Sequence, residues 1–380
     1  MEGENNTMEM HINRLPAITW NRMDINDIPV NLPKFTGAEL AFDTNLDAKQ
    51  ATHATASGAA QAMHATTESA EQVAHATVSN SKWATYATTP LPISTGAGAA
   101  ADAVFEGLPV YDLTVNKGET AETTAEYLGA GDKGAVLQVS AGEGSNVTLY
   151  THVKPVENAN AALRILLKLG KNAKLRLVEL LEPAQNAAML HDLGGQLGDG
   201  AEVEVLHLYL GSGDLYSGCR MDLIGEEAKF TYQAGYLGRN QQVLDVNLIS
   251  NHIGKNTTCN LRADGTLKDQ AQKTFRGTID FKRGCKGSVG AEQENVLLLG
   301  EDIVSKTIPL ILCAEEDVQG DHGATIGELD EDTLFFFAAR GIDPVTAENI
   351  LTREKLNRLA ESVGREDMKI LAQNAIEEVL

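Results

Sequence analysis

The sequence has few of the residues that commonly carry chemistry or crosslinks. Aromatic residues make up 5% of the 380 positions, and the four cysteines include no CxxC pair. This pattern excludes a disulfide framework and a self-sufficient zinc site. No GxxxxGK[ST], GxSxG or HExxH motif occurs, so nothing supports a phosphate-binding loop, an esterase elbow or a zincin helix. We therefore expect that the chain does not hydrolyse ATP itself.

Positive charge is also scarce. The chain has 31 Lys and Arg residues against 53 Asp and Glu residues, which gives a formal net charge of −22. Without a surplus of basic residues, binding to nucleic acid or to an anionic membrane surface is disfavoured. The N-terminus lacks the basic and apolar regions of a signal peptide, and the longest uncharged stretch, residues 83–101, contains two prolines. We expect a cytoplasmic protein.

Composition divides the chain into an N-terminal region (1–104), a core (105–325) and a C-terminal domain (326–380). The first region contains an 11-residue repeat: His-Ala-Thr at 53–55, 64–66 and 75–77, and Tyr-Ala-Thr at 86–88. Eleven residues are about three helical turns. In a helix, neighbouring histidines of the repeat would lie about 16 Å apart, too far to share a metal ion. We expect a polar helix or a mobile segment.

A second, longer repeat fills the core. Each copy has an apolar residue, a turn containing glycine, a small residue and then an alternating strand. The turn glycines are 28, 27, 29 and 30 residues apart: Gly170, Gly198, Gly225, Gly254 and Gly284. The amphipathic helices of a βαβ fold are missing between copies. This pattern favours a mainly β protein in which 105–325 form a parallel β-helix, with an antiparallel sandwich as the alternative.

The C-terminal domain is predicted to be helical. Asp330 can cap one helix that ends at Gly341, and Asp343-Pro344 has the residues of a second helix start. Apolar residues from Met368 to Val379 form a stripe at helical spacing. So few residues cannot bury all these faces on one another. The helices must pack on the end of the solenoid, on a partner, or on both.

Candidate chemical groups are concentrated at the end of the core. Residues 313–325 contain one thiol, four carboxylates and one imidazole, all potential ligands for iron or another metal. The alternative is a solvated acidic turn that closes the last coil. Lys273 and Arg276 form a basic pair in a nearby strand-like run, for which the alternative is a surface ladder pair across neighbouring strands.

The last third of the chain resembles the SufB/SufD family of iron–sulfur cluster assembly proteins. The resemblance lies in KTFRGTIDFKRGCKG (273–287) and in residues 294–342, above all in DHGATIG (321–327). It implies a right-handed parallel β-helix with a C-terminal helical domain. It also implies that two such subunits pair through their β-helices, that residues 326–380 dock SufC, an ABC-type ATPase, and that a cysteine desulfurase system acts indirectly.

Within that family, the pattern is most like SufD. Glu294 stands where SufB scaffolds carry a cysteine, and Gly323 follows His322 where SufB tends to have glutamate. By its position, His322 corresponds to the histidine of the SufD pattern. Gly320 stands where SufD often has a cysteine, so a Cys/His pair is missing. Asp321 can substitute as an oxygen ligand, which suits iron better than an assembled cluster.

We therefore expect a SufD-like scaffold subunit that pairs with a SufB-like subunit. Iron or an iron–sulfur cluster would be held transiently at the interface by His322 and Asp321, with Glu316 and Cys313 as further candidate metal ligands. One alternative is a homodimeric, SufB-like scaffold in which Cys285 or Cys313 supplies thiolates. A β-helix enzyme acting on polysaccharide is disfavoured because aromatic residues are few and no export signal is seen.

Overall fold

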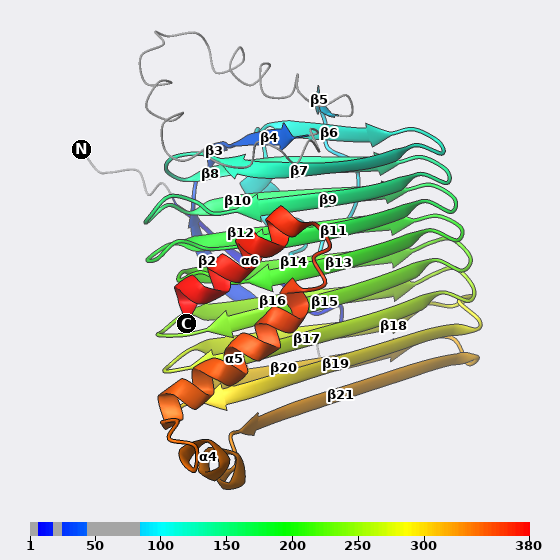
Figure 1. Cartoon of the computed structure of the whole chain (residues 1–380). Helices are drawn as coiled ribbons and strands as arrows, with labels where there is room; N and C mark the ends of the chain where they lie inside the picture. The colour runs from blue at the N-terminus through cyan, green and yellow to red at the C-terminus, as the bar shows by residue number, and fades with distance from the viewer. Residues whose placement is uncertain (1–6, 18–24, 44–83) are drawn as a thin grey trace, which may run out of the picture.

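The core of the protein is a β-solenoid. A computed structural model describes residues 7–17, 25–43 and 84–380. From β6 (Val110–Val115) to β21 (Val318–Glu328) the chain alternates between two sheets, with one strand in each sheet per coil, and completes about eight coils (Figure 1). Every neighbouring pair along this run is parallel. The parallel β-helix expected from the repeat is confirmed, and the antiparallel sandwich is excluded.

The two sheets differ by one strand. The ten-stranded sheet contains β3 (Thr36–Gly37), β5 (Ala84–Ala87), β6 (Val110–Val115), β8 (Lys133–Ala141), β10 (Ala161–Leu169), β12 (Ala188–Leu197), β14 (Asp214–Leu223), β16 (Val243–His252), β18 (Gln272–Phe281) and β20 (Val304–Cys313). The nine-stranded sheet contains β4 (Glu39–Asp43), β7 (Thr120–Leu128), β9 (Asn146–Val153), β11 (Lys174–Leu181), β13 (Glu202–Tyr209), β15 (Lys229–Gly238), β17 (Thr258–Lys268), β19 (Ser288–Leu299) and β21 (Val318–Glu328). The short strands β4 and β5 pair antiparallel with β7 and β6 and so close the N-terminal end.

The repeated glycines form one edge of the solenoid, where each coil crosses from the ten-stranded to the nine-stranded sheet. A side chain at Gly254 would place its Cβ 2.2 Å from the carbonyl oxygen of Gly225, directly in the previous coil. Two residues further on, Asn256 has φ of 56°, and Asn172, Gly200 and Glu227 hold the same left-handed position in earlier coils. The glycine repeat therefore sets how closely successive turns can stack.

Strand alternation fills the interior. In β11, for example, Leu175, Leu177 and Leu181 join the central hydrophobic core, whereas Val178 and Leu180 face outward. Because each strand is in register with the next, an inward residue lies over an inward residue of the preceding coil. The interior is therefore a set of columns that run along the whole solenoid.

The described parts of the N-terminal region pack on the outer face of the ten-stranded sheet. The hairpin β1 (Thr7–Ile12) and β2 (Ile28–Pro33) packs there with the 3-10 helix η2 (Ala99–Ala101) and α3 (Asp102–Phe105). The first three copies of the 11-residue repeat lie outside the described residues. The fourth, Tyr86-Ala87-Thr88, overlaps strand β5, so a helical interpretation is wrong for that copy.

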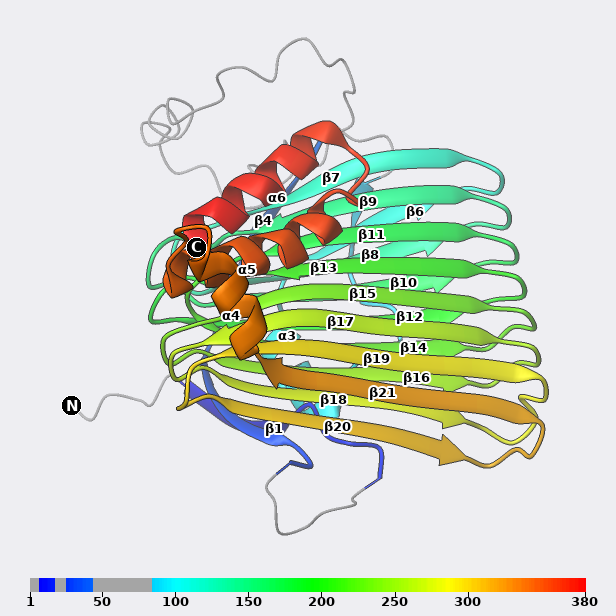
Figure 2. The same ribbon diagram turned by 60° about the horizontal axis from the view of Figure 1, so that its bottom comes forward.

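The C-terminal helices are α4 (Glu331–Ala338), α5 (Pro344–Ala360) and α6 (Glu366–Val379), with the predicted caps at Asp330 and Asp343. Packing on the end of the solenoid is wrong for α5 and α6. They lie across the outer face of the nine-stranded sheet (Figure 2), where Leu356 and Ile376 pack against Leu206 and Leu208. The stripe of α6 is thus covered by the protein's own sheet. Among the described residues, no helix is long and apolar enough to span a bilayer.

The turn geometry predicts a specific glycine requirement. Gly254→Ala forces a methyl group into the Gly225 carbonyl, and overpacking of this kind costs roughly 1–3 kcal/mol. We expect a lower free energy of unfolding in denaturant titrations. Gly327→Ala is the matched control, because a Cβ there meets nothing within 4 Å. Equal stability of the two variants would contradict the stacking argument.

Candidate functional site at the open end of the solenoid

The C-terminal end of the solenoid is open. Strand β21 pairs only with β19, and β20 pairs only with β18 among the described strands, so both present an unpaired edge. Apart from its first residue, Val318, β21 is exposed along its whole length. Both strands run along the lower side of the molecule in Figure 2. A long, exposed edge is a template for adding further strands.

His322 occupies an inward position at this end. It pairs in register with Glu292 of β19, whose side chain lies in the interior one coil earlier. Asp321 is adjacent in the strand and therefore projects to the opposite face; its carboxylate accepts a hydrogen bond from Gln319 at 3.1 Å. Within one subunit, His322 and Asp321 thus face different directions and cannot converge on one ion.

Beneath His322 lies a buried polar cluster. Glu294 is fully buried and accepts hydrogen bonds from Lys273 Nζ at 2.8 and 3.0 Å and from the Tyr236 hydroxyl at 2.8 Å. Thr307 also donates to this carboxylate. Glu292 lies beside the pair, against the backbone of Gly277. Two carboxyl groups and one ammonium group therefore share the last enclosed coils.

The environment shifts the ionisation of these groups. Burial raises the pKa of Glu292 to about 7, helped by the negative charge of Glu294 and opposed by Lys273. Burial also lowers the pKa of Lys273, although Glu294 partly restores it. Desolvation disfavours each charged form, while the ion pair favours it. Near neutral pH, Glu292 can therefore take up or release a proton directly behind His322.

The other two predicted ligands lie elsewhere. Cys313 ends β20, and its thiol donates to the backbone carbonyl of Glu315 at 2.9 Å. Glu316 is in the turn that follows. His322 is four strand residues beyond Val318, or about 13 Å along the strand. The structure therefore brings neither Cys313 nor Glu316 to His322.

The cysteines differ in accessibility. Cys313 is exposed, whereas Cys219, Cys259 and Cys285 are buried. Burial raises the pKa of Cys259 to about 12 and also raises the pKa of Cys285. A thiolate ligand from the buried cysteines is therefore disfavoured, and of the pair considered from sequence only Cys313 is accessible.

The basic pair from the sequence does not share a surface. Lys273 points inward to Glu294, but Arg276 points outward, where it binds Asp245 Oδ1 at 2.6 Å and the carbonyl of Ile25 at 2.6 Å. Both side chains are at most 2% exposed, so a surface ladder pair is wrong. Their spacing of three residues explains the difference, because side chains an odd number of positions apart lie on opposite faces of a strand.

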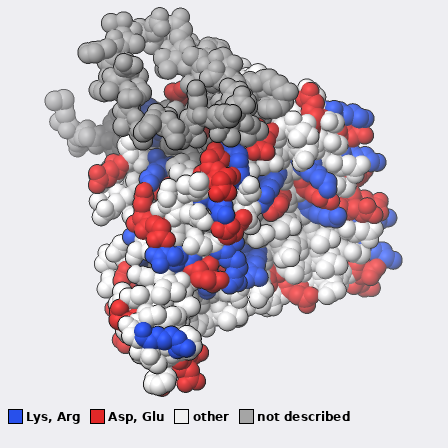
Figure 3. All heavy atoms as spheres, in the orientation of Figure 1, with Lys and Arg blue, Asp and Glu red and all other residues white. Residues whose placement is uncertain are grey.

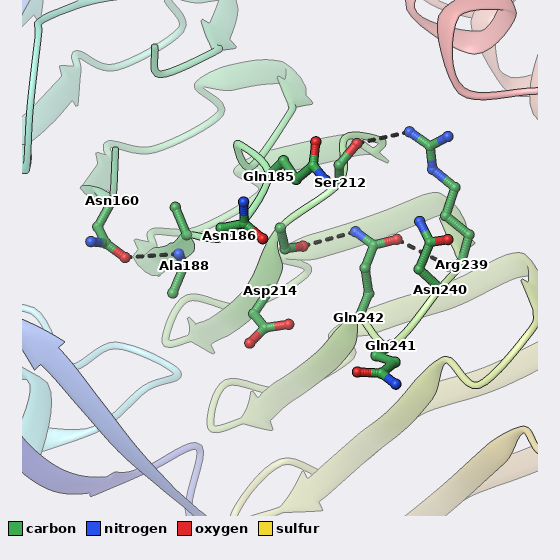
Figure 4. A pocket seen from close by; sticks show the side chains of 12 residues that line it. Asn160, Gln185, Asn186, Ala188, Ser212, Asp214, Arg239, Asn240, Gln241 and Gln242 are labelled. Carbon is green, nitrogen blue, oxygen red and sulfur yellow. Dashed lines mark hydrogen bonds between the residues drawn. The ribbon is translucent and has the colours of Figure 1, made fainter. Parts of the chain in front are cut away.

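A shallow groove of about 740 Å³ lies on the edge opposite the glycine turns (Figure 4). Polar side chains in this groove form hydrogen bonds between neighbouring turns. Gln242 donates to Gly213 O at 2.8 Å, and Arg239 donates to Ser212 Oγ at 2.8 Å. None of the predicted site residues lines it. On the face shown in Figure 3, acidic and basic side chains are intermixed.

The open end therefore offers an imidazole and a proton-accepting carboxyl group beside an unpaired strand edge. Nitrogen and oxygen donors of this kind suit Fe²⁺, whereas an assembled cluster needs thiolates, and the exposed Cys313 at the end of β20 is not brought to His322. Sequence reasoning did not identify Glu292. The pattern Glu292-Gln293-Glu294 indicates its position. Residues two apart in a strand share a face, so both glutamates lie on the same inward face as Val296.

Comparison with known proteins agrees with this geometry. A sequence model described as "SUF system FeS cluster assembly, SufBD core domain" matches residues 130–355, more than half of the chain. The chain belongs to the SufBD family. The match covers nearly all coils of the solenoid and extends into α5.

Curated SufBD relatives are similar over a shorter region. The iron-sulfur cluster assembly protein SufD of Bacillus subtilis (strain 168) is 25% identical over 158 residues, which are 42% of this chain and 36% of that protein. A SufBD family protein of Synechocystis sp. is 27% identical over 154 residues, 40% of this chain and 32% of that protein. A chloroplastic SufBD family protein of Arabidopsis thaliana is 23% identical over 179 residues, which are 46% of this chain and 32% of that protein. The chain thus spans about a third of the length of these relatives.

The raised pKa of Glu292 predicts how stability depends on pH. Between about pH 4.5 and 7 the unfolded chain loses this proton first, so the free energy of unfolding falls as pH rises. The full decrease is about 3 kcal/mol, taking about 1.4 kcal/mol per pH unit. Glu292→Gln removes this contribution and is expected to be more stable than the parent at pH 8.

Denaturant titrations at pH 4.5 and pH 8 check this expectation. Glu301→Gln, at an exposed position, is the control and keeps the parent's pH dependence. If the free energy of unfolding of Glu292→Gln differed between the two pH values as much as that of the parent, ionisation of Glu292 in the folded protein would carry no cost. The prediction would then be wrong.

Proposed function

We propose that this SufBD protein is a SufD-like, non-catalytic scaffold subunit that pairs with a SufB-like subunit in the cytoplasm. The observation that carries the proposal is the exposed edge strand β21 (Val318–Glu328). Both broad flanks of the solenoid are already covered, one by the N-terminal region and the other by α5 and α6. The open end is where a second β-helix can extend both sheets by strand pairing.

Side-chain chemistry at this end supports a paired state. Ile326 lies on the inward face of β21 and is 42% exposed because no further coil covers it. Burying such a side chain stabilises an interface by up to about 1.5–3 kcal/mol. The same partner would enclose His322, which would then contribute one nitrogen ligand from this side of the interface.

The cargo in this proposal is iron or a nascent iron–sulfur cluster, held transiently. His322 binds the metal, and Glu292 behind it accepts protons released nearby. The thiolates come from the SufB-like partner, since the one exposed cysteine among the described residues, Cys313, does not lie beside His322. Asp321, on the opposite face of β21, contributes only if the partner's strand brings metal to that side. A cysteine desulfurase system supplies sulfur indirectly, through other components.

We further propose that a SufC-type ABC ATPase docks within residues 326–380 and supplies the ATP hydrolysis. Helix α4 supports this docking, because it has no buried residue and exposes Phe335 (74%) and Phe336 (51%). Val345, at the start of α5, is also exposed (63%). The stripe from Met368 to Val379 cannot serve, since it is buried on the nine-stranded sheet.

A homodimeric, SufB-like scaffold is the alternative. It would use the same strand edges but would need its own thiolate, and Cys313 is the exposed candidate. Its position at the end of β20, away from His322, disfavours this arrangement. Mass measurement of the complex from the native host distinguishes a heteromeric pair from two copies of this chain.

His322→Ala tests the metal site. The chain is co-expressed with the SufB-like and ATPase proteins of its host and purified anaerobically. We expect normal co-purification, because the side chain is exposed, but at least a tenfold loss of cluster absorbance and iron content. His11→Ala, at another exposed histidine, is the control. Undiminished iron content in His322→Ala would remove this residue from the site.

Ile326→Lys tests pairing through the open end. A lysine there places an unpaired charge in the proposed interface, so co-purification of the SufB-like subunit should be lost while the chain remains folded by circular dichroism. Ile224→Lys is the matched control, since Ile224 is 47% exposed in the turn after β14. Retained pairing in Ile326→Lys would place the interface elsewhere.

Phe335→Asp tests docking of the ATPase. We expect loss of the ATPase from the co-purified complex, with the SufB-like subunit retained. Ile370→Asp, on the exposed side of α6 (49%), should leave the complex intact. This pair is more informative than deletion of the helices, because deletion would uncover the apolar face of the nine-stranded sheet.

A further inference from the structure

A glutamate and two histidines meet in the interior of the solenoid, well away from the open end. Glu179 lies on β11, His191 on β12 and His207 on β13, and all three are fully buried. Among the described residues they form the one group of three potential ligands whose donor atoms all lie within 4.8 Å of one another. Neither the repeat pattern nor the function proposed above uses them.

The donor atoms converge on one carboxylate oxygen. Glu179 Oε2 lies 2.7 Å from His207 Nε2 and 3.0 Å from His191 Nε2. The two imidazole rings are nearly perpendicular, at 87°, with their centroids 5.1 Å apart. Two imidazole nitrogens and one carboxylate oxygen are a donor set used repeatedly for Zn²⁺.

The second polar atom of each of these three side chains lies next to a hydroxyl group. Thr151 donates to Glu179 Oε1 at 2.7 Å. His207 Nδ1 lies 2.5 Å from the Tyr209 hydroxyl and 3.2 Å from that of Tyr232. His191 Nδ1 lies 3.3 Å from Ser217 Oγ. Outer contacts of this kind fix the orientation of metal-bound imidazoles and carboxylates.

One buried atom is left without a hydrogen bond. His191 Nε2 lies 3.0 Å from Glu179 Oε2, but it has no hydrogen-bond partner. In the described part of the chain, no lysine or arginine nitrogen lies within 4.0 Å of Glu179. A buried carboxylate without a cationic side chain and an unpaired nitrogen beside it are both costly. A cation between them satisfies both.

We propose that Glu179, His191 and His207 bind a divalent transition metal, Zn²⁺ by preference, as a structural ion enclosed in the solenoid. Metal bonds of about 2.0–2.1 Å place tetrahedral donors about 3.3 Å apart. From the present 3.0 and 2.7 Å, His191 Nε2 needs to withdraw from Oε2 by about 0.3 Å and His207 Nε2 by about 0.6 Å. A water molecule fills the fourth position. The ion ties three successive strands across both sheets and is separate from the cargo site at His322.

The test loads the metal during folding, because the site is closed in the folded chain. The full-length protein is unfolded with chelator, refolded with equimolar Co²⁺ and desalted. We expect one Co²⁺ per chain, the intense visible bands of a four-coordinate ion, and release to chelator over hours. X-ray absorption at the cobalt edge of this unmutated protein should show two imidazoles, which keeps the test valid if a variant fails to refold.

The variants locate the ion. Glu179→Gln and His191→Gln should bind Co²⁺ at least tenfold more weakly. His252→Gln, at another fully buried histidine, and His322→Ala, at the open end, should retain one Co²⁺ per chain. The proposal is overturned if the refolded parent holds no Co²⁺, if His191→Gln keeps it, or if His322→Ala loses it. The last result would place the ion in the cargo site instead.

Discussion

In-register stacking of parallel strands is the constraint on which the rest of this structure depends. Each coil lies about 4.8 Å from the next, so every inward side chain has a fixed neighbour above and below it. A polar group that enters such a column must find its partner within one or two coils. The Lys273–Glu294 pair and the Glu179–His207 contact are both satisfied in this way, between strands that are close neighbours in the stack.

A stack of coils has two ends, and the two ends of this solenoid differ in structure. At the N-terminal end, β4 and β5 run antiparallel to the first coil and close it. At the other end, β20 and β21 present open edges and the inward row that contains His322. An edge of this length is an aggregation hazard in an isolated protein. In the pairing proposed above, this edge joins a second β-helix and places His322 at the junction.

The segments outside the solenoid restrict where partners can bind. The N-terminal region is anchored to the ten-stranded sheet by Asn13, whose Nδ2 donates to Asp245 Oδ1 at 2.7 Å, and by Arg276. Helices α5 and α6 are anchored on the other sheet by apolar packing and by ion pairs such as Lys154–Glu378 at 2.8 Å. The open end and α4 are left uncovered by these segments. The proposed partner pairing and the proposed ATPase docking therefore use separate surfaces.

The sequence by itself determined the solenoid, because Gly198, Gly225 and Gly254 recur at the length of one coil and the strands between them alternate. It also determined the helix starts at Asp330 and Asp343, since capping depends on a few adjacent residues. Only the tertiary structure decided which distant polar residues meet: Glu292 beneath His322, and Glu179 beside His191 and His207. Coil lengths, measured between turn glycines, vary from 27 to 30 residues. The register between strands, and with it every contact in an inward column, therefore follows from packing of the whole stack.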